Sequence, residues 1–536
     1  MTAPARPPAA ASSPRRDLAT VAGSAPPRIG TDAAAEARHS ARTGVASLLG
    51  AATNGLLGFV LAVVITRGYG TAGSGVFFAA IGVVTVAAAV CTLGAETGLI
   101  WTLPRRRAGA SGDAARILPV ALIPPLAAAL VVAAVGVVGA EPLASRLLDA
   151  PDADGALVIA LSFAAVPLVV GMTLLLAVVR CVRPIRAYLA VQSVLLPLAR
   201  PVLVGVAVLA GWGLVAGLTG WLVPAALALL VCLTLVAGPL GVGRGVALRP
   251  RPTDWRTFWR FALPRAASAV IDAGAVWVGV LLTSVLAGQA EAGVFGAVGR
   301  YILAGQLAMQ GLRVAVSPQL SRLLGHGQPA TAAAVHRQLT VWAVVLSWPV
   351  YLLLAIHGRA FLQIFGADFS AGATAMTVLA LAMLVNTGVG NVQSLLLMSG
   401  RSGLHLAAAS AGLLVTVSLG VLLIPGHGAT GAAAAWAAGI VTENLIAFGC
   451  ARAVIGQPLV DATMLRAALA VVVAVGGAAT VGALVGGRVL VGLAVTVGVL
   501  VAAGVGVSTV PRVRRGIRVT MGQIRGGTPD GAPPRP

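Results

Sequence analysis

Residues 55–80 read GLLGFVLAVVITRGYGTAGSGVFFAA. An apolar run ends at the single cation Arg67, a glycine-rich junction follows, and a second apolar run begins near Val76. Runs of about 20 apolar residues are long enough to cross the hydrocarbon core of a bilayer as helices. This stretch therefore predicts two membrane-spanning helices joined by a short connection.

The same alternation continues along the 536-residue chain, which is 58% hydrophobic and 10% charged, with a mean hydropathy of +0.95. A soluble domain carries far more polar surface. The apolar runs are continuous, which favours helices over the alternating strands of a β-barrel. The expected fold class is all-α, a polytopic membrane protein with about 14 transmembrane helices. The expected spans are 44–66, 76–103, 117–139, 156–179, 187–210, 212–238, 267–287, 299–321, 338–357, 372–398, 402–424, 428–451, 464–486 and 489–511.

The basic residues indicate how these spans are oriented. All 37 are arginine, because the chain contains no lysine. The tails and the gaps after even-numbered spans hold about 30 of them, whereas the other gaps hold Arg67, Arg146, Arg359 and Arg488. Cytoplasmic loops are enriched in Lys and Arg, so we expect a multi-pass protein of the cell membrane with both termini cytoplasmic. The net charge of +21 then reflects topology, and no nucleic-acid partner is expected.

A repeat indicates how the spans are grouped. Ser74-Gly75-Val76-Phe77 and Ala292-Gly293-Val294-Phe295 lie 218 positions apart, and that offset also aligns most of the following spans. An offset of six spans predicts two parallel six-helix lobes, a common transporter design. The expected domains are a disordered cytoplasmic tail (1–43), an N-lobe (44–243), a basic cytoplasmic linker (244–266), a C-lobe (267–455), two further spans (456–511) and a cytoplasmic tail (512–536).

Short motifs occur between and at the ends of the spans. They are Thr66-Arg67-Gly68-Tyr69-Gly70 with Gly75-Val76-Phe77, Leu93-Gly94 through Leu99, Ala292-Gly293-Val294-Phe295 with Arg300 and Pro318-Gln319-Leu320, Ile364-Phe365-Gly366-Ala367-Asp368, and Ile424-Pro425-Gly426-His427-Gly428 with Gly431-Ala432-Ala433. Over residues 44–455, their order and spacing resemble the polysaccharide and oligosaccharide flippases of the multidrug/oligosaccharidyl-lipid/polysaccharide (MOP) exporter superfamily.

The resemblance implies a flippase that moves a polyprenyl-pyrophosphate-linked oligosaccharide across the cytoplasmic membrane by alternating access, for cell-surface polysaccharide or cell-wall assembly. It implies a lipid-linked glycan substrate, membrane lipids around a monomer, and a glycan polymerase or glycosyltransferases as partners. The alternatives are a cation-coupled multidrug (MATE-like) exporter and a flippase for the lipid-linked peptidoglycan precursor. A membrane-bound glycan enzyme and a scaffold for cell-wall assembly are alternatives from other classes.

Polar residues inside apolar spans are costly in hydrocarbon and therefore mark candidate sites. The candidates for a substrate cavity are Arg313, Arg300, Arg200, Arg67, Gln306, Gln310, Asn386 and Gln393. The candidates for ion coupling or sugar binding are Asp272, Glu96 and Glu443. Arginine suits phosphate because its planar fork can bond two oxygens. Helical spacing places Gln306, Gln310 and Arg313 on one face, and Asn386 and Gln393 on another.

Each candidate also has a structural interpretation. Arg300 and Arg313 can extend to the membrane interfaces, and Arg67 can anchor a helix end there. Arg200 can pair with Glu96 or Asp272. The amides can join neighbouring helices, and the carboxylates can simply pair with arginines.

Sequence features of enzymes are missing. A chain without lysine has no Walker A motif, and the sequence has no HExxH and no GxSxG at a strand-to-helix turn. The four cysteines have no metal-binding spacing. We therefore expect no catalytic residue, no metal and no cofactor.

Overall fold

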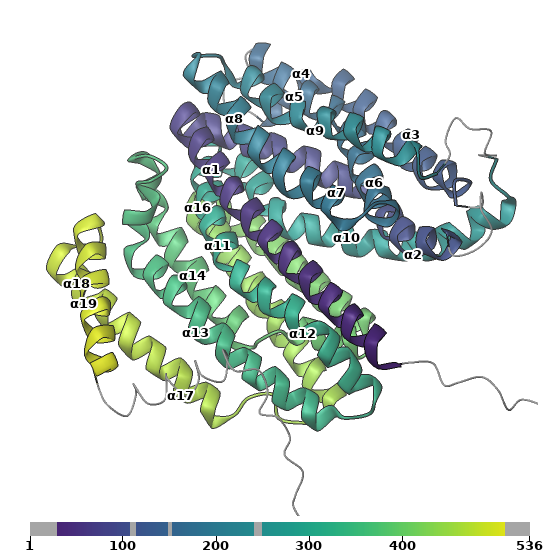
Figure 1. The fold of residues 1–536 in the computed structure, drawn as a ribbon. Coiled ribbons are helices and arrows are strands. Elements are labelled where there is room, and N and C mark those ends of the chain that lie inside the picture. Colours follow the sequence, from purple (N-terminus) through teal and green to yellow (C-terminus); the bar gives the residue numbers. More distant parts are fainter. Residues whose placement is uncertain (1–28, 108–113, 148–152, 241–248, 510–536) are drawn as a thin grey trace, which may run out of the picture. The chain divides into compact units, whose positions relative to one another are not determined.

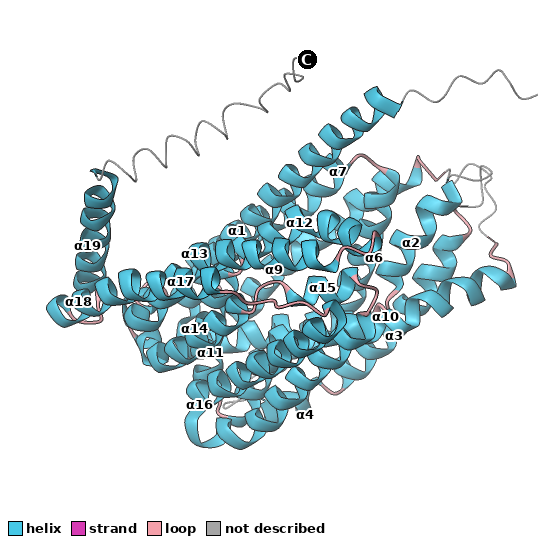
Figure 2. Ribbon diagram, turned by 90° about the horizontal axis from the view of Figure 1, so that it is seen from below, coloured by secondary structure: helices cyan, strands magenta, loops and turns pink. Residues whose placement is uncertain are grey.

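The structure is a computed structural model that describes residues 29–107, 114–147, 153–240 and 249–509. These residues form helices joined by short connections, with no strand among them (Figure 2). The chain divides into two units, 1–46 and 47–536, and the packing described below lies within the second.

The first half of the chain is a series of helices with few long connections (Figure 1). They are α1 (Ile29–Cys91), α2 (Ala95–Arg107), α3 (Ile117–Val138), α4 (Ala140–Leu147), α5 (Ala153–Ala164), α6 (Val166–Val182), α7 (Ile185–Leu189), the π-helix η1 (Ala190–Leu195), α8 (Leu196–Leu209) and α9 (Leu214–Ala237).

The second half begins with a long helix and ends with a helical hairpin. Its elements are α10 (Pro252–Leu286), α11 (Gln289–Gly305), α12 (Leu307–Gly325), α13 (Pro329–Leu362), the 3₁₀-helix η2 (Asp368–Gly372), α14 (Ala373–Gly388), α15 (Val392–Met398), α16 (Ser402–Ile455), α17 (Ala462–Val471), the π-helix η3 (Val472–Gly476), α18 (Gly477–Gly486) and α19 (Leu490–Thr509).

The expected spans fall on these helices, and the all-α membrane fold is confirmed. Ten helical segments of the described residues are long and apolar enough to cross a membrane. Two of them cover two expected spans each: Ser402–Ile455 contains both, and Leu49–Cys91 covers most of spans 44–66 and 76–103. A non-helical glycine with positive φ separates the two spans in each case, Gly70 at φ 66° and Gly428 at φ 51°. The expected count of fourteen stays a prediction.

Two expected boundaries differ from the helix ends that the structure describes. Residues 29–43 were expected to be a disordered tail, but α1 begins at Ile29. Residues 252–266 were expected to lie in a linker, but they form the first turns of α10. Phe258 and Ala262 in these turns are buried against α2, so their apolar side chains extend the helix beyond the membrane-length run.

Each half of the molecule has a hydrophobic core of its own. One core joins α2, α3, α6, α8 and α9 with the start of α10. Another joins α12, α13, α15 and α16. The structure therefore contains two helical groups, each with a core of its own, and the division into an N-lobe and a C-lobe stays a prediction.

The two groups meet where the repeated glycines cross. A Cβ added at Gly75 in α1 would overlap the carbonyl oxygen of Gln289, and one added at Gly293 in α11 would overlap that of Thr71. Only glycine lets the two backbones approach so closely. The core around this crossing contains Phe77, Phe295 and other side chains from both groups. The motif that revealed the repeat in the sequence thus forms the contact between its two copies.

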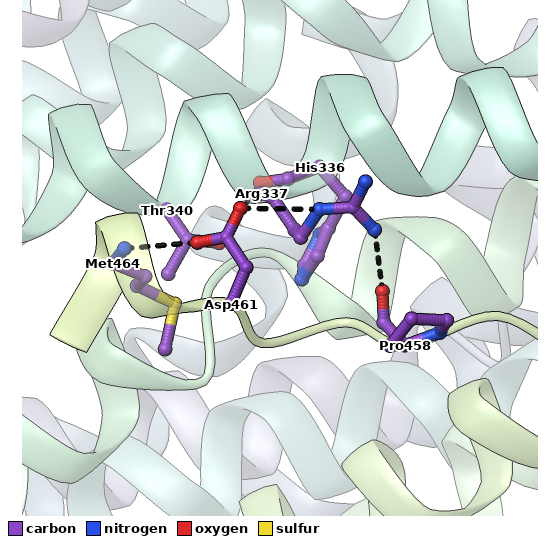
Figure 3. Close-up of polar contacts among 6 residues, drawn as sticks. All are labelled: His336, Arg337, Thr340, Pro458, Asp461 and Met464. Carbon is purple, nitrogen blue, oxygen red and sulfur yellow. Dashed lines mark hydrogen bonds and ion pairs between the residues drawn. The ribbon is translucent and has the colours of Figure 1, made fainter.

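The segment that leads to the last spans is fixed to α13. Arg337 donates to the carbonyl oxygen of Pro458 at 2.6 Å and forms an ion pair with Asp461 at 3.4 Å (Figure 3). Asp461 also accepts a hydrogen bond from the backbone N–H of Met464 at 2.9 Å, which caps α17. These contacts hold the start of α17 against the C-lobe.

Candidate functional site

A cavity of about 360 Å³ lies between α1 and the helices α11 and α12, and we call it the Arg300 cavity. Its polar lining consists of Asn54, Arg300 and Gln310. Gly55 and Gly58 form part of the wall on α1, where the absence of side chains leaves the space open. A cavity of this size lies within the range of small-molecule sites.

Arg300 is held in this cavity by aromatic rings. Its guanidinium lies 5.0 Å from the centroid of Phe78 and 4.8 Å from that of Trp277. Within the described residues it forms no hydrogen bond and no ion pair. Cation–π contacts orient a guanidinium without neutralising it. Arg300 therefore presents a full positive charge and free N–H donors to the cavity.

An aromatic cluster borders one end of the Arg300 cavity. Phe59 lines the cavity, and its ring lies 4.9 Å from that of Tyr301 and 5.4 Å from that of Phe365. The hydroxyl of Tyr301 donates to the carbonyl oxygen of Phe361 at 2.6 Å. Phe365 is fully buried. The cluster therefore joins α1, α11 and the end of α13 in one apolar contact.

Arg67, at the end of the first expected span, joins α1 to the segment that follows α13. Its Nε donates to the carbonyl oxygen of Ile364 at 2.8 Å, and its Nη2 donates to that of Gln363 at 2.9 Å. Gln363 and Ile364 directly follow α13, and they lie 296 and 297 positions after Arg67 in the sequence. The geometry makes Arg67 a connection between the two halves of the protein, outside the Arg300 cavity.

A second polar group lies within the C-lobe. Arg313 donates to Gln393 at 3.5 Å, and Gln393 donates to Glu443 at 2.7 Å. Asp272 and His405 interact electrostatically with each other, and Glu443 interacts with both Asp272 and Arg313. Together these five residues form the C-lobe polar cluster, which connects α10, α12, α15 and α16.

The remaining amides mostly connect helices. Asn386 accepts a hydrogen bond from Asn444 at 3.0 Å, and Gln306 points at the sulfur of Met383, 3.8 Å away. Gln310, in contrast, lines the Arg300 cavity. Gln306, Gln310 and Arg313, which were expected on one helical face, thus have different neighbours. Gln306 lies between α11, which ends at Gly305, and α12, which begins at Leu307.

Arg200 lies in a different cavity from Arg300. That cavity of about 290 Å³ is lined by Glu96 of α2, Arg180 of α6 and Arg200 of α8. Arg200 stacks over Trp221 at 4.5 Å. The ion pair expected between Arg200 and either Glu96 or Asp272 is not formed among the described residues. Asp272 faces His405 in the C-lobe instead.

Some residues of these sites were not expected from the sequence. Arg180 was assigned to membrane topology only, because it ends a span. Asn54 lies in the first expected span, one helical turn before Gly58, and the search for polar residues inside apolar runs that gave the other candidates would have found it. His405 lies just inside α16, and only the fold brings it to Asp272.

Comparisons with known proteins identify the fold. No protein-family model and no curated protein matches the chain. A solved structure described as "Lipid II flippase MurJ, inward closed conformation" matches with a TM-score of 0.66 and 11% identity, over 85% of this chain and 97% of that one. An inward-facing MATE family transporter of the MOP superfamily gives 0.59 and 16%, over 75% and 94%. The MATE multidrug transporter DinF-BH gives 0.56 and 17%, over 81% and 99%.

These identities are low, and the likeness establishes the fold. The chain has the fold of the MOP-superfamily exporters, as the sequence motifs predicted, and it is a multi-pass membrane protein.

Proposed function

We propose that this protein exports a polyprenyl-pyrophosphate-linked oligosaccharide across the cytoplasmic membrane, for cell-surface polysaccharide or cell-wall assembly. The observation that carries the proposal is the unneutralised positive charge of Arg300. It is a cation in a cavity between the two halves of an exporter fold, and the described residues supply no carboxylate to neutralise it.

The chemistry of the cargo fits this cavity. A pyrophosphate carries negative charge that is expensive to place in hydrocarbon. Arg300 offers it a charge-assisted, two-pronged hydrogen bond. Asn54 and Gln310 add amide groups, which both donate and accept, and can therefore bond phosphate oxygens or sugar hydroxyls. The polyprenyl tail stays in the bilayer while the head occupies the cavity.

The contacts around the cavity suit alternating access. The Gly75–Gly293 crossing, the aromatic cluster and the Arg67 hydrogen bonds all close the end at which the first and ninth expected spans finish. By the arginine distribution, that end is the outer one. In this state the cargo head enters from the cytoplasmic side, and separation of these contacts releases it outside.

The experiment is a deletion of the gene, followed by identification of lipid-linked glycans on the cytoplasmic side of the membrane. We expect one lipid-linked oligosaccharide to accumulate and a plasmid copy of the wild-type gene to clear it. A copy with Arg300→Gln should clear it poorly, whereas Arg322→Gln, at an exposed arginine of α12, should behave as wild type. If the deletion strain accumulates no lipid-linked glycan and instead becomes sensitive to drugs, the proposal is contradicted.

The C-lobe polar cluster favours a second candidate function, cation-coupled export of small molecules. Asp272 and Glu443 are carboxylates close enough to interact, and such a pair suits a proton or a metal cation. The lipid-linked peptidoglycan precursor is a further candidate cargo, because it carries the same pyrophosphate linkage. Identification of the accumulated glycan separates it from an oligosaccharide cargo.

A further inference from the structure

The N-lobe contains a second cavity that shares no lining residue with the Arg300 cavity. We call it the Arg200 cavity. Its polar lining is formed by Glu96, Thr173, Arg180, Tyr188, Gln192 and Arg200, from helices α2, α6, α7, η1 and α8. Apolar residues such as Ile100 and Met172 complete it. A polar cavity within a membrane-spanning lobe is costly unless a ligand or water occupies it.

A π-turn builds one wall of this cavity. Tyr188, Gln192, Leu196 and Arg200 all line it, at intervals of four residues. In a regular α-helix, the rotation between Tyr188 and Arg200 would leave them about 120° apart. The π-helix η1 accommodates one extra residue between them, which reduces the difference to about 20°. The insertion therefore aligns the phenol, the amide and the guanidinium on one side, and π-turns are frequent at functional sites.

Arg200 is held in place but is not neutralised. Its guanidinium stacks on Trp221 at 4.5 Å, and its Nε is buried with no hydrogen-bond partner among the described residues. It lies well inside the segment Ile185–Leu209, too far from either end to reach an interface easily. A buried, unsatisfied charged donor is expensive and points to a missing acceptor.

The charges of the cavity indicate the class of ligand. Arg180 and Arg200 contribute two positive charges, and Glu96 contributes one negative charge. None of these three side chains is in an ion pair among the described residues, so the cavity has a net positive lining. Arg180 lies over the ring of Tyr188, 5.6 Å from its centroid. Two guanidinium groups suit a phosphate, and a carboxylate beside them suits a hydroxyl or an ammonium group attached to that phosphate.

We propose that the Arg200 cavity binds the phosphate of a hydroxyl- or amine-bearing headgroup, independently of the Arg300 cavity. Arg180 and Arg200 hold the phosphate, and Glu96 accepts a hydrogen bond from the headgroup. Gln192, Thr173 and Tyr188 bond the remaining oxygens. The inference does not rest on the proposed function, since it concerns binding in the N-lobe and not the transported cargo.

Binding of two probes to the purified full-length chain tests this site. One is a short-chain phosphatidylglycerol, and the other is glycerol phosphate, which has the same head without a lipid. Binding of the lipid alone identifies a membrane headgroup as the source, and binding of both identifies a site open to soluble phosphates. Either result supports the site, and binding of neither overturns it.

Variants locate the binding. We expect Arg200→Gln to weaken it by about tenfold or more, since a charge-assisted hydrogen bond is lost. Glu96→Gln should strengthen it several-fold, because a negative charge beside the phosphate is removed. Arg322→Gln, the matched control at an exposed arginine that lines neither cavity, should bind as wild type. The opposite effects of the first two variants separate binding from folding damage. Unchanged affinity in both, or an equal loss in Arg322→Gln, overturns the proposal.

Discussion

Arg300 is the residue on which the functional account depends. Its charge is presented to the cavity by two aromatic rings, Phe78 and Trp277, which hold the guanidinium without competing for its donors. Arg200 makes the same kind of cation–π contact, with the ring of Trp221. Two such arginines, in separate cavities, distinguish this interior from that of an exporter whose charged groups are carboxylates alone.

Replacement of Arg300 should reduce transport strongly without loss of the fold. Arg300→Gln removes a charged hydrogen-bond donor and should lower the transport rate by about 10- to 100-fold. Arg300→Lys keeps the charge but loses the planar fork, so its rate should fall between those of wild type and the glutamine variant. Transport rates of both variants, normalised to the amount of folded protein, check this. Equal rates in wild type and Arg300→Gln would contradict a role in binding the cargo.

The site residues show where sequence analysis reaches its limit. Several polar residues that line a cavity and lie inside an apolar run, such as Arg200, Arg300 and Gln310, were identifiable from the cost of polar groups in hydrocarbon, whereas Asn54 was missed. Their grouping was not identifiable, because helices far apart in the sequence meet at each cavity and the π-turn η1 changes the direction in which side chains point. Neither feature has a periodic signal in the sequence. Arg180 was missed because a span-end arginine also serves topology.

At the scale of helices, the Gly75–Gly293 crossing is the central structural contact. Gly293→Ala should separate α1 from α11, because the added methyl group overlaps the carbonyl oxygen of Thr71. Overpacking of this kind costs about 1–3 kcal/mol. We expect a lower thermal unfolding temperature in detergent.

Gly299→Ala is the matched control on the same helix, since its Cβ would meet only the ring of Trp436, 3.8 Å away. Its unfolding temperature should equal or exceed that of wild type, because alanine favours a helix by about 1 kcal/mol over glycine. A similar unfolding temperature for both variants would show that the crossing tolerates a side chain.

The Arg67 contact should bias the protein toward the state closed at this end. Arg67→Ala removes both hydrogen bonds to the end of α13, so the open state should gain population. Spin labels at the exposed positions Ala72 and Ala367, in a cysteine-free background, report the separation across the contact. We expect a longer-distance component to grow in Arg67→Ala and to stay unchanged in Arg146→Ala. The reverse pattern, or no change in either variant, would remove Arg67 from the closure.

At the scale of the whole molecule, the segments that connect consecutive expected spans contact other segments on the same side of the expected membrane. Connections after odd-numbered expected spans contact each other, as in Arg67 with Gln363 and Ile364, and in Glu291 with the backbone N–H of Ala429 at 2.7 Å. Connections after even-numbered spans do likewise, as in Arg106 with Asp254 at 2.7 Å and Arg337 with Asp461 at 3.4 Å. If the chain crosses the membrane at each expected span, the segments after odd-numbered spans lie on one side and those after even-numbered spans on the other. These contacts agree with that arrangement.

The orientation of that arrangement is a separate prediction. If the arginine-rich side is cytoplasmic, a green fluorescent protein fused to the C-terminus should fluoresce and a fused alkaline phosphatase should be inactive. The same phosphatase inserted after Gly70 should be active. An active phosphatase at the C-terminus would reverse the orientation and, with it, the side from which cargo enters.

The fold at this scale was largely predictable. Apolar runs predicted the helical membrane fold, and the two lobes inferred from the Gly75/Gly293 repeat stay a prediction. The extent of α10 was not predictable from hydropathy, because its first turns carry Asp254 and several arginines and are fixed by tertiary packing of Phe258 and Ala262. Hydropathy did not predict the helix over residues 29–43 of α1 either, because their polar composition resembles a tail.

The most direct test measures translocation of a defined cargo by the purified protein. A polyprenyl-pyrophosphate-linked oligosaccharide is placed in liposomes with the full-length chain, and a glycosidase added outside removes only the glycans that have crossed. With a proton or sodium gradient of either sign imposed, wild type and Arg322→Gln should accelerate the crossing, and Arg300→Gln should be slower by about tenfold or more. No acceleration by wild type, or equal rates for wild type and Arg300→Gln, would contradict the claim that this protein moves a phosphate-bearing glycan lipid through the Arg300 cavity.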